Sequence, residues 1–135
     1  MKVAIIGAGA AGYFAAIWVR ENHPESQVTI LEKTSKILSK VRISGGGRCN
    51  VTNAEPSLSA LSKAYPRGQK LLKKGFSEFS NLDFMKWLES QGVEIKTEER
   101  GHVFPKSDSS QTIIDCLTKK ANESGVQLQL NWPVY

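Results

Sequence analysis

Hydrophobic and polar positions near the amino terminus predict a strand, a helix and a second strand. Residues 3–6 are all apolar, which fits a short buried strand, and they run into a segment rich in glycine and alanine. The segment Ala10–Asn22 fits a helix that stops before the breaker His23-Pro24. Gln27–Leu31 then fits a second strand, which ends at Glu32. This order predicts a βαβ unit with two parallel strands.

The middle of the chain predicts one more helix and a pair of short strands. Apolar residues repeat at helical spacing over residues 82–91, and Asn81 is placed to cap that helix. The apolar side of this helix comprises Leu82, Phe84, Met85, Trp87 and Leu88. It indicates core packing, not a ring-stacking site. Short strands are expected over residues 93–97 and 102–104, joined by a turn at 98–101.

The last part of the chain repeats the order of helix and then strand. Ser107 or Asp108 is expected to cap a helix over residues 109–124, and Gly125 marks its end. Residues 126–130 alternate in polarity, which fits a strand with one better-covered face. As a third parallel strand it gives the sheet order 3-2-1 with right-handed crossovers. The predicted fold class is therefore α/β, a partial Rossmann-like three-layer domain whose second crossover carries a helix and a hairpin.

The length of 135 residues, with 40% apolar and 23% charged residues, fits one globular domain. We divide it into a βαβ core with a glycine-rich loop (residues 1–53), an elaborated crossover (54–106), and a final helix and strand (107–135). A doubly wound dinucleotide-binding domain has two βαβ halves, and only the first is recognisable here. The chain is therefore expected to be the amino-terminal part of a longer protein.

The turn after the first strand carries a G-x-G-x-x-G pattern at residues 7–12. Gly7 permits a tight reversal, Gly9 lets backbone N–H groups approach a pyrophosphate, and Gly12 lets the helix pack closely on the sheet. Glu32 follows Gly12 by 20 positions and ends the second strand. A carboxylate there accepts hydrogen bonds from an adenosine ribose and repels the 2′-phosphate of NADP. The motif thus predicts FAD or NAD(H) as the ligand.

Two other interpretations of the amino terminus are weaker. Lys2 and the mostly apolar residues up to Val19 resemble a signal peptide, but glycines would break its helix and the strand pattern continues to Glu32. A glycine turn without a ligand is disfavoured by the strand, helix and acid around it. No segment is expected to span a membrane.

A second glycine cluster follows a stretch with four cations and no acid, at residues 33–42. It contains three consecutive glycines at 45–47, which favour neither a helix nor a strand. Such a backbone suits close approach to a ligand, with its N–H groups turned toward oxygen atoms. Ser44, Arg48, Asn50, Thr52 and Asn53 add donors around it.

Three sequence elements together resemble one family. They are G-A-G-A-A-G at residues 7–12, I-S-G-G-G-R-C-N-V-T-N at 43–53, and G-H-V-F-P-K-S at 101–107. Over nearly its whole length the chain is similar to a bacterial family of FAD-dependent oxidoreductases, described as BaiN/RdsA-like or aminoacetone-oxidase-like. Members of that family are longer and carry a carboxyl-terminal segment that completes the flavin pocket. Some are assigned to the reduction of enone-like or steroid-like substrates.

The resemblance implies FAD with its pyrophosphate over residues 9–12, its adenosine ribose at Glu32, and residues 44–50 near the flavin end. The family usually has G-[RK]-K before the second cluster, where this chain has Ser39-Lys40-Val41-Arg42, so Lys40 and Arg42 are both candidates. The expected cofactor-binding residues are Gly7, Gly9, Ala10, Ala11, Gly12, Glu32, Lys33, Lys40, Arg42, Ser44, Gly45, Gly46, Gly47, Arg48, Cys49 and Asn50. No catalytic residue is identified, and no metal-ligand spacing occurs.

Cys49 and Cys116 lie 67 positions apart without a C-x-x-C pair. This suits a reduced cytoplasmic protein and predicts neither a disulfide nor a zinc site. We interpret Cys49 as a small residue filling space beneath the glycine loop; the alternative is a thiol beside the flavin. Arg48 either contacts the cofactor or substrate or braces the loop. His102 is expected to be structural or exposed.

The net charge of +5 comes largely from one basic window between Glu55 and Glu78. Its cations are Lys63, Arg67, Lys70, Lys73 and Lys74. We interpret this window as a solvated face, with attraction of the anionic cofactor or a substrate carboxylate as the functional alternative. Neither nucleic acid nor a membrane is expected as a partner.

The leading functional hypothesis is the FAD-binding part of a flavin-dependent oxidoreductase. Its flavin would accept a hydride from NAD(P)H or from an unidentified small-molecule substrate. One alternative is an NAD(H)-binding module of a dehydrogenase, in which the triple-glycine loop would have no specific role. Another is that this chain alone is not an enzyme, because an open edge at the first strand would leave it without cofactor, self-associated, or both.

Overall fold

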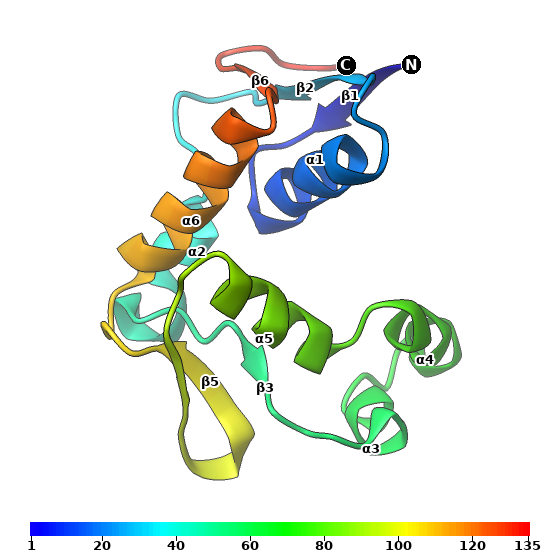
Figure 1. Cartoon of the computed structure of the whole chain (residues 1–135), viewed down its shortest axis with the longest axis vertical. Coiled ribbons are helices and arrows are strands. Elements are labelled where there is room, and N and C mark those ends of the chain that lie inside the picture. Colours follow the sequence, from blue (N-terminus) through cyan, green and yellow to red (C-terminus); the bar gives the residue numbers. More distant parts are fainter. The chain divides into compact units, whose positions relative to one another are not determined.

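The computed structural model describes residues 1–135 and divides into two compact units. Unit 1 comprises Met1–Cys49 and Ser109–Tyr135, and unit 2 comprises Asn50–Asp108. Figure 1 follows the chain by colour: both ends of the chain belong to unit 1, and unit 2 is inserted between them. None of the helices combines the length and the apolar composition that crossing a membrane requires.

Unit 1 is built on a parallel three-stranded sheet in the order β1-β2-β6. Its strands are β1 (Lys2–Ile6), β2 (Gln27–Leu31) and β6 (Gln127–Gln129). In the register, Ile30 of β2 lies opposite Ile5 on one side and Leu128 on the other. The Rossmann-like α/β fold with strand order 3-2-1 is thereby confirmed. The third strand is shorter than predicted, and all its residues are exposed, so neither of its faces is well covered.

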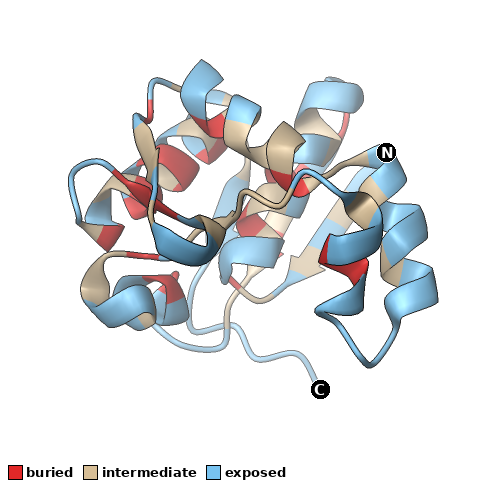
Figure 2. Ribbon diagram, turned by 90° about the horizontal axis from the view of Figure 1, so that it is seen from below, coloured by how far each residue is buried: buried red, intermediate tan, exposed pale blue.

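Two helices complete the core of unit 1. Helix α1 spans Ala10–Asn22, as predicted, and packs on β1 and β2; helix α6 spans Ser110–Glu123 and packs against α1. The buried residues of this core include Ala16, Ile17, Val28, Ile30 and Leu117. Figure 2 shows buried residues in short stretches along the helices with exposed residues between them, the pattern of helices that bury one face. Burial of each large aliphatic side chain stabilises the unit by about 1.5–3 kcal/mol.

After β2 the chain of unit 1 returns to the glycine turn. Leu38 has a positive φ of 50° and is 1% exposed, and its N–H donates to the Ala8 carbonyl oxygen at 2.8 Å. Helix α2 (Ser39–Ile43) and the tight turn η1 (Ser44–Gly47) follow. The sequence pattern does not predict α2, which is only five residues long.

Unit 2 contains a small antiparallel sheet in the order β3-β5-β4 and three helices. The strands are β3 (Thr52–Asn53), β4 (Ile95–Thr97) and β5 (His102–Pro105), with the turn η2 (Glu99–Gly101) between the last two. The helices are α3 (Leu58–Lys63), α4 (Gln69–Glu78) and α5 (Asn81–Ser90). The predicted hairpin is confirmed. For the basic window, with its break at residues 66–68, the sequence indicates loop and a short helix, and the structure has α3 and the longer α4 there. The strand β3 is not predicted.

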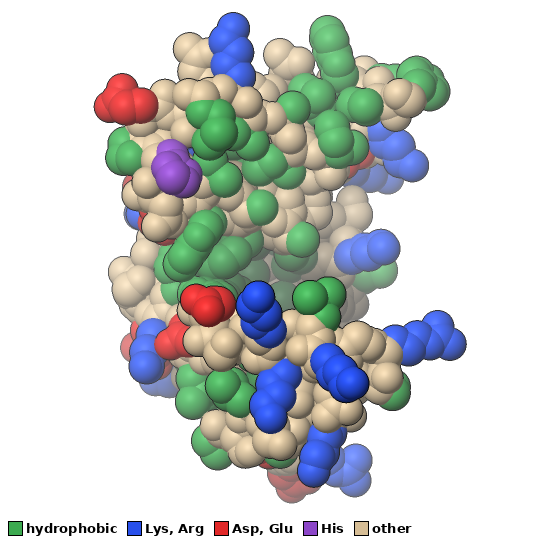
Figure 3. All heavy atoms as spheres, turned by 90° about the vertical axis from the view of Figure 1, so that its right-hand side faces the viewer, with side chains coloured by type: hydrophobic (Ala, Val, Ile, Leu, Met, Phe, Trp, Pro, Cys, Tyr) green, Lys and Arg blue, Asp and Glu red, His purple; other side chains and the backbone are tan.

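The core of unit 2 lies where α5 packs on β3 and β4. It is formed by Leu61, Leu88, Val93, Val103 and Phe104, each at most 6% exposed. The basic window falls on α3, α4 and the turn between them, and all five of its cations are exposed. Figure 3 shows Lys and Arg side chains gathered over this part of the surface. A solvated face is thus what the structure shows for these residues.

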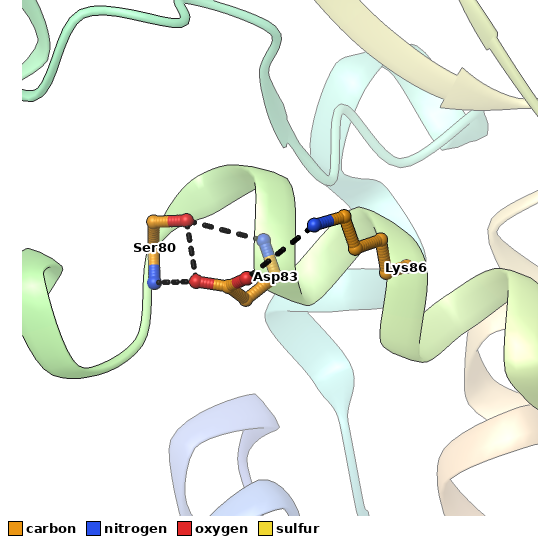
Figure 4. A network of polar contacts seen from close by, with 3 residues as sticks. All are labelled: Ser80, Asp83 and Lys86. Carbon is orange, nitrogen blue, oxygen red and sulfur yellow. Dashed lines mark hydrogen bonds and ion pairs between the residues drawn. The ribbon is translucent and has the colours of Figure 1, made fainter.

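Helix α5 is capped by Ser80, not by Asn81 as predicted. The Ser80 hydroxyl accepts from the Asp83 N–H at 3.2 Å, and the Ser80 N–H donates to Asp83 Oδ2 at 2.9 Å (Figure 4). The Ser80 hydroxyl also donates to Asp83 Oδ2 at 2.6 Å. This hydroxyl first, and the Ser80 N–H second, hold the pKa of Asp83 below its usual range. Asn81 instead donates to the backbone oxygens of Asn53 and Glu55, so the residue one position earlier is free to take the cap.

Helix α6 is capped by Ser109, one or two residues later than the predicted caps. The Ser109 hydroxyl accepts from the Gln111 N–H at 3.3 Å, which replaces the expected caps Ser107 and Asp108. Asp108 has a positive φ of 52°, a conformation that ends the preceding segment and is unsuited to an N-cap.

Candidate functional site

The glycine turn between β1 and α1 has one packed side and one open side. A Cβ atom at Gly12 would lie 2.0 Å from the Gly7 carbonyl oxygen, so the helix approaches the strand too closely for any side chain. Gly7 itself has φ +99°, a left-handed conformation that favours glycine. Gly9 differs from both, because its φ is −88° and a Cβ there would meet no atom within 4 Å. Of the three glycines, only Gly9 combines open space with a backbone conformation that any residue can adopt.

The amino terminus of α1 begins at this open position. Gly9 is the N-cap, no side chain caps the helix, and no acidic residue occurs in its first turn. The first N–H groups of a 13-residue helix therefore face outward with the positive end of the helix dipole. Such a terminus favours an anion, a pyrophosphate in particular.

Glu32 is held beside this turn by its own hydrogen bonds. Its carboxylate accepts from the Ala8 N–H at 3.0 Å and from the Thr34 N–H and hydroxyl, both at 2.9 Å. These donors, the Ala8 N–H first, lower the pKa of Glu32. A carboxylate can accept about four hydrogen bonds, so capacity for a ribose hydroxyl is left. The carboxylate is thus ionised and fixed in position before any ligand arrives.

A cavity of about 360 Å³ connects Gly9 and Glu32. Four of the predicted residues line it, namely Gly9, Ala10, Glu32 and Lys40. Its other walls come from Ala8, Thr34, Lys36, Leu38, Ser39 and Val41, which were not predicted as ligand contacts. The hydrogen bond of Leu38 to Ala8 brings this segment to the turn. The cluster of cations after Glu32 was the available signal for Lys36.

Arg42, the second basic candidate, has a different partner. Its guanidinium donates to Gln111 Oε1 of α6 at 2.8 Å, and it does not line the cavity. Lys40 is therefore the better placed of the two candidates. Gly7, Ala11, Gly12 and Lys33 also lie outside the cavity lining, the first and third because they shape the turn.

The triple-glycine cluster forms a left-handed turn. Gly45, Gly46 and Gly47 have φ of 56°, 68° and 87°, and a Cβ at Gly46 or Gly47 would meet no atom within 4 Å. The turn is closed by the Cys49 N–H, which donates to the Ser44 carbonyl oxygen at 2.9 Å. Backbone conformation thus explains the three glycines, and the open space beside them leaves room for a ligand.

Cys49 is buried, at 5% exposed, and burial raises the pKa of its thiol. Its φ is +62°, which is unusual for a residue with a side chain. A thiol that stays protonated is a poor nucleophile, so the structure is in keeping with a space-filling role. Arg48, at the end of the turn, is partly buried.

Asn50 begins unit 2 and is hydrogen bonded within it. The amide is assigned from its neighbours: with its nitrogen toward the Thr52 and Val103 carbonyl oxygens, at 2.8 and 3.1 Å, its oxygen accepts from His102 Nδ1 at 3.0 Å. From the sequence, Asn50 is expected at the cofactor and His102 is expected to be structural or exposed. The pairing joins residues 52 positions apart, through the antiparallel strands β3 and β5.

Two curated relatives are similar to the chain along most of its length. It is 30% identical over 127 residues to the 3-dehydro-bile acid delta(4,6)-reductase of Clostridium scindens, covering 94% of this chain and 30% of the relative. It is 31% identical over 126 residues to the ribosomal RNA dihydrouridine synthase of Haemophilus influenzae, covering 93% and 30%. The chain therefore spans about 30% of the length of these relatives.

Solved structures and a family model complete the comparison. The fold is similar to a variant of the Escherichia coli quinol fumarate reductase FrdA, with TM-score 0.69, 18% identity, and coverage of 97% of this chain and 26% of that one. Thermovibrio ammonificans THI4 gives TM-score 0.61, 15% identity, and coverage of 96% and 38%. The model described as HI0933-like protein Rossmann domain matches residues 1–135. The chain thus belongs to the HI0933-like Rossmann domain family, as its sequence motifs indicated.

Proposed function

We propose that unit 1 binds the ADP part of FAD and that the whole protein is a flavin-dependent oxidoreductase. The observation that carries this proposal is the open approach to Gly9, beside an uncapped helix terminus and the fixed carboxylate of Glu32. The pyrophosphate binds at the Gly9 and Ala10 N–H groups, and the adenosine ribose donates to Glu32. Lys36 and Lys40, which line the same cavity, offset the charge of the phosphates.

When bound, FAD supplies the hydride and electron transfer. The residues of this chain bind and orient it: the helix terminus fixes the phosphates, and Glu32 fixes the ribose and disfavours a 2′-phosphate. The open turn at 45–47 lies in the segment that family resemblance assigns to the flavin end. NAD(P)H is the proposed electron donor of the whole protein. The cytoplasm is its proposed location, because the two cysteines of this chain are free thiols.

The names of the two relatives suggest a common chemistry. A delta(4,6)-reductase and a dihydrouridine synthase both saturate a carbon–carbon double bond, in very different molecules. We extend that chemistry to the whole protein: reduction of a double bond conjugated to a carbonyl group.

The cofactor is tested by calorimetric titration of the chain with FAD, NADH and NADPH. FAD is expected to bind, and NADPH to bind at least about tenfold more weakly than NADH because Glu32 repels its 2′-phosphate. Binding of NADH without binding of FAD would replace the flavoprotein proposal by the NAD(H) module. Equal affinity for NADH and NADPH would show that Glu32 does not contact the adenosine ribose.

A further inference from the structure

Unit 2 contains a second, larger cavity whose walls carry no charged side chain. Its volume is about 500 Å³, and every residue that lines it belongs to unit 2. Four of its lining residues are aromatic, namely Tyr65, Phe76, Phe79 and Phe84. The rings of Tyr65 and Phe76 have centroids 5.7 Å apart. Aromatic walls without charge favour a flat, uncharged ligand that stacks on or between rings.

The hydrogen-bond partners of His102, which lines this cavity, define which of its ring nitrogens carries a hydrogen atom. Both neighbours of the Asn50 amide nitrogen are backbone carbonyl oxygens, which only accept, so the amide oxygen must face His102 Nδ1. Nδ1 therefore carries a hydrogen atom. The nitrogen left for a ligand is Nε2, which in the neutral ring is an acceptor. Asn50 thus fixes the tautomer of a histidine that lines the cavity.

A second acceptor lines the same cavity at Asn81. This residue is 6% exposed, and its nitrogen donates to the backbone oxygens of Asn53 and Glu55 at 2.6 and 2.8 Å. Its side-chain oxygen is buried and has no hydrogen-bond partner. A buried carbonyl oxygen without a donor costs about 1–3 kcal/mol, which a ligand N–H or O–H group would recover.

We propose that this cavity binds a flat, uncharged ring that carries an N–H or O–H donor, such as a lactam or cyclic imide. The aromatic side chains contact the ring faces, and His102 Nε2 and Asn81 Oδ1 accept from its polar edge. A carboxylate or phosphate is disfavoured, because no cation lines the cavity and the two groups assigned to the ligand's polar edge, His102 Nε2 and Asn81 Oδ1, are acceptors. That this ring is the part of the substrate that is reduced rests on the proposed function; that the cavity binds it does not.

The test is an NMR titration of the isotope-labelled chain with 2-pyridone, and with 1-methyl-2-pyridone as the matched ligand without a donor. 2-Pyridone is expected to shift the signals of Thr52, Phe79, Asn81 and His102, and the methylated ligand is expected to bind at least about tenfold more weakly. Equal affinity of the two ligands, or shifts confined to unit 1, would overturn the proposal. So would no shift up to the solubility limit.

Two variants locate the interaction. In Asn50→Ala the imidazole ring signals are expected to move toward the tautomer with hydrogen on Nε2, and 2-pyridone affinity to fall; an unchanged tautomer contradicts the role of Asn50. Lys70→Ala, on α4 and outside the cavity lining, is the control and should bind like the parent. FAD binding is read separately at residues 8–12. Loss of FAD binding with retained 2-pyridone binding refutes only the proposed function, and the reverse refutes only the cavity proposal.

Discussion

The packed and the open side of the glycine turn use the same residue type for opposite reasons. At Gly12 the space for a side chain is already occupied by the Gly7 carbonyl oxygen, so glycine is needed for folding. At Gly9 that space is empty and the backbone conformation is ordinary, so folding does not require glycine there. The difference separates residues that make the fold from those that leave room for a ligand. It also permits a matched pair of variants, Gly9→Ala and Gly12→Ala, which add the same methyl group three positions apart.

The largest effect is expected for Gly12→Ala. Its Cβ would lie 2.0 Å from a backbone oxygen, so α1 must move away from β1. We expect a loss of about 3 kcal/mol in the free energy of unfolding, measured by urea denaturation followed by circular dichroism. A variant as stable as the parent would show that the helix does not approach the strand this closely.

Gly9→Ala is expected to change binding and not folding. Its unfolding free energy should stay within about 0.5 kcal/mol of the parent. FAD affinity should fall at least about tenfold, equivalent to about 1.4 kcal/mol, because the new methyl group occupies the approach to the helix terminus. Calorimetry with FAD provides the measurement. An unchanged affinity for FAD would show that the pyrophosphate does not bind at this turn.

Ser80→Ala tests a position outside the turn. Loss of the hydroxyl that accepts from the Asp83 N–H should cost about 1 kcal/mol of stability in unit 2. Binding of FAD should be unchanged, which is checked in the same titration as for Gly9→Ala. A loss of FAD affinity here would mean that destabilisation anywhere mimics the Gly9 effect.

The smallest effect is expected for Glu32→Gln, as a change in pH dependence. The pKa of Glu32 is lower folded than unfolded, so its stabilising contribution is complete above the unfolded pKa and is lost as pH falls through the folded pKa. Denaturation midpoints between about pH 6 and pH 3 should fall more for the parent than for the variant. Parallel curves for the two proteins would mean that the Ala8 and Thr34 donors do not favour the ionised form.

The elements of unit 1 that are determined by residues close together in the sequence could be predicted. Ala10–Asn22 and Gln27–Leu31 have the bounds that their patterns and the His23-Pro24 breaker predict. The strand β3 could not be predicted, since two residues have no period and pair only with distant β5. Only loop and a short helix could be predicted where α4 lies, because α4 buries no residue completely, and six of its ten residues are Lys, Gln, Ser or Glu with a glycine among the rest.

The candidate site was predictable to a similar degree. Gly9 and Glu32 follow from a motif with fixed spacing, and both line the cavity. Lys36 and Ser39 reach it only because Leu38 adopts a left-handed conformation and bonds to Ala8, which no local pattern indicates. The pairing of Asn50 with His102 likewise depends on sheet topology.

The most direct test of the central claim is an NMR titration of the labelled parent chain and of Gly9→Ala with FAD. In the parent, the backbone amide signals of Gly9, Ala10, Glu32 and Thr34 should shift together, while those of α5 stay in place. In the variant the same shifts should require at least about tenfold more FAD. Shifts that leave Gly9 and Glu32 unmoved, or an identical titration of the variant, would contradict the assignment of the ADP part of FAD to this turn.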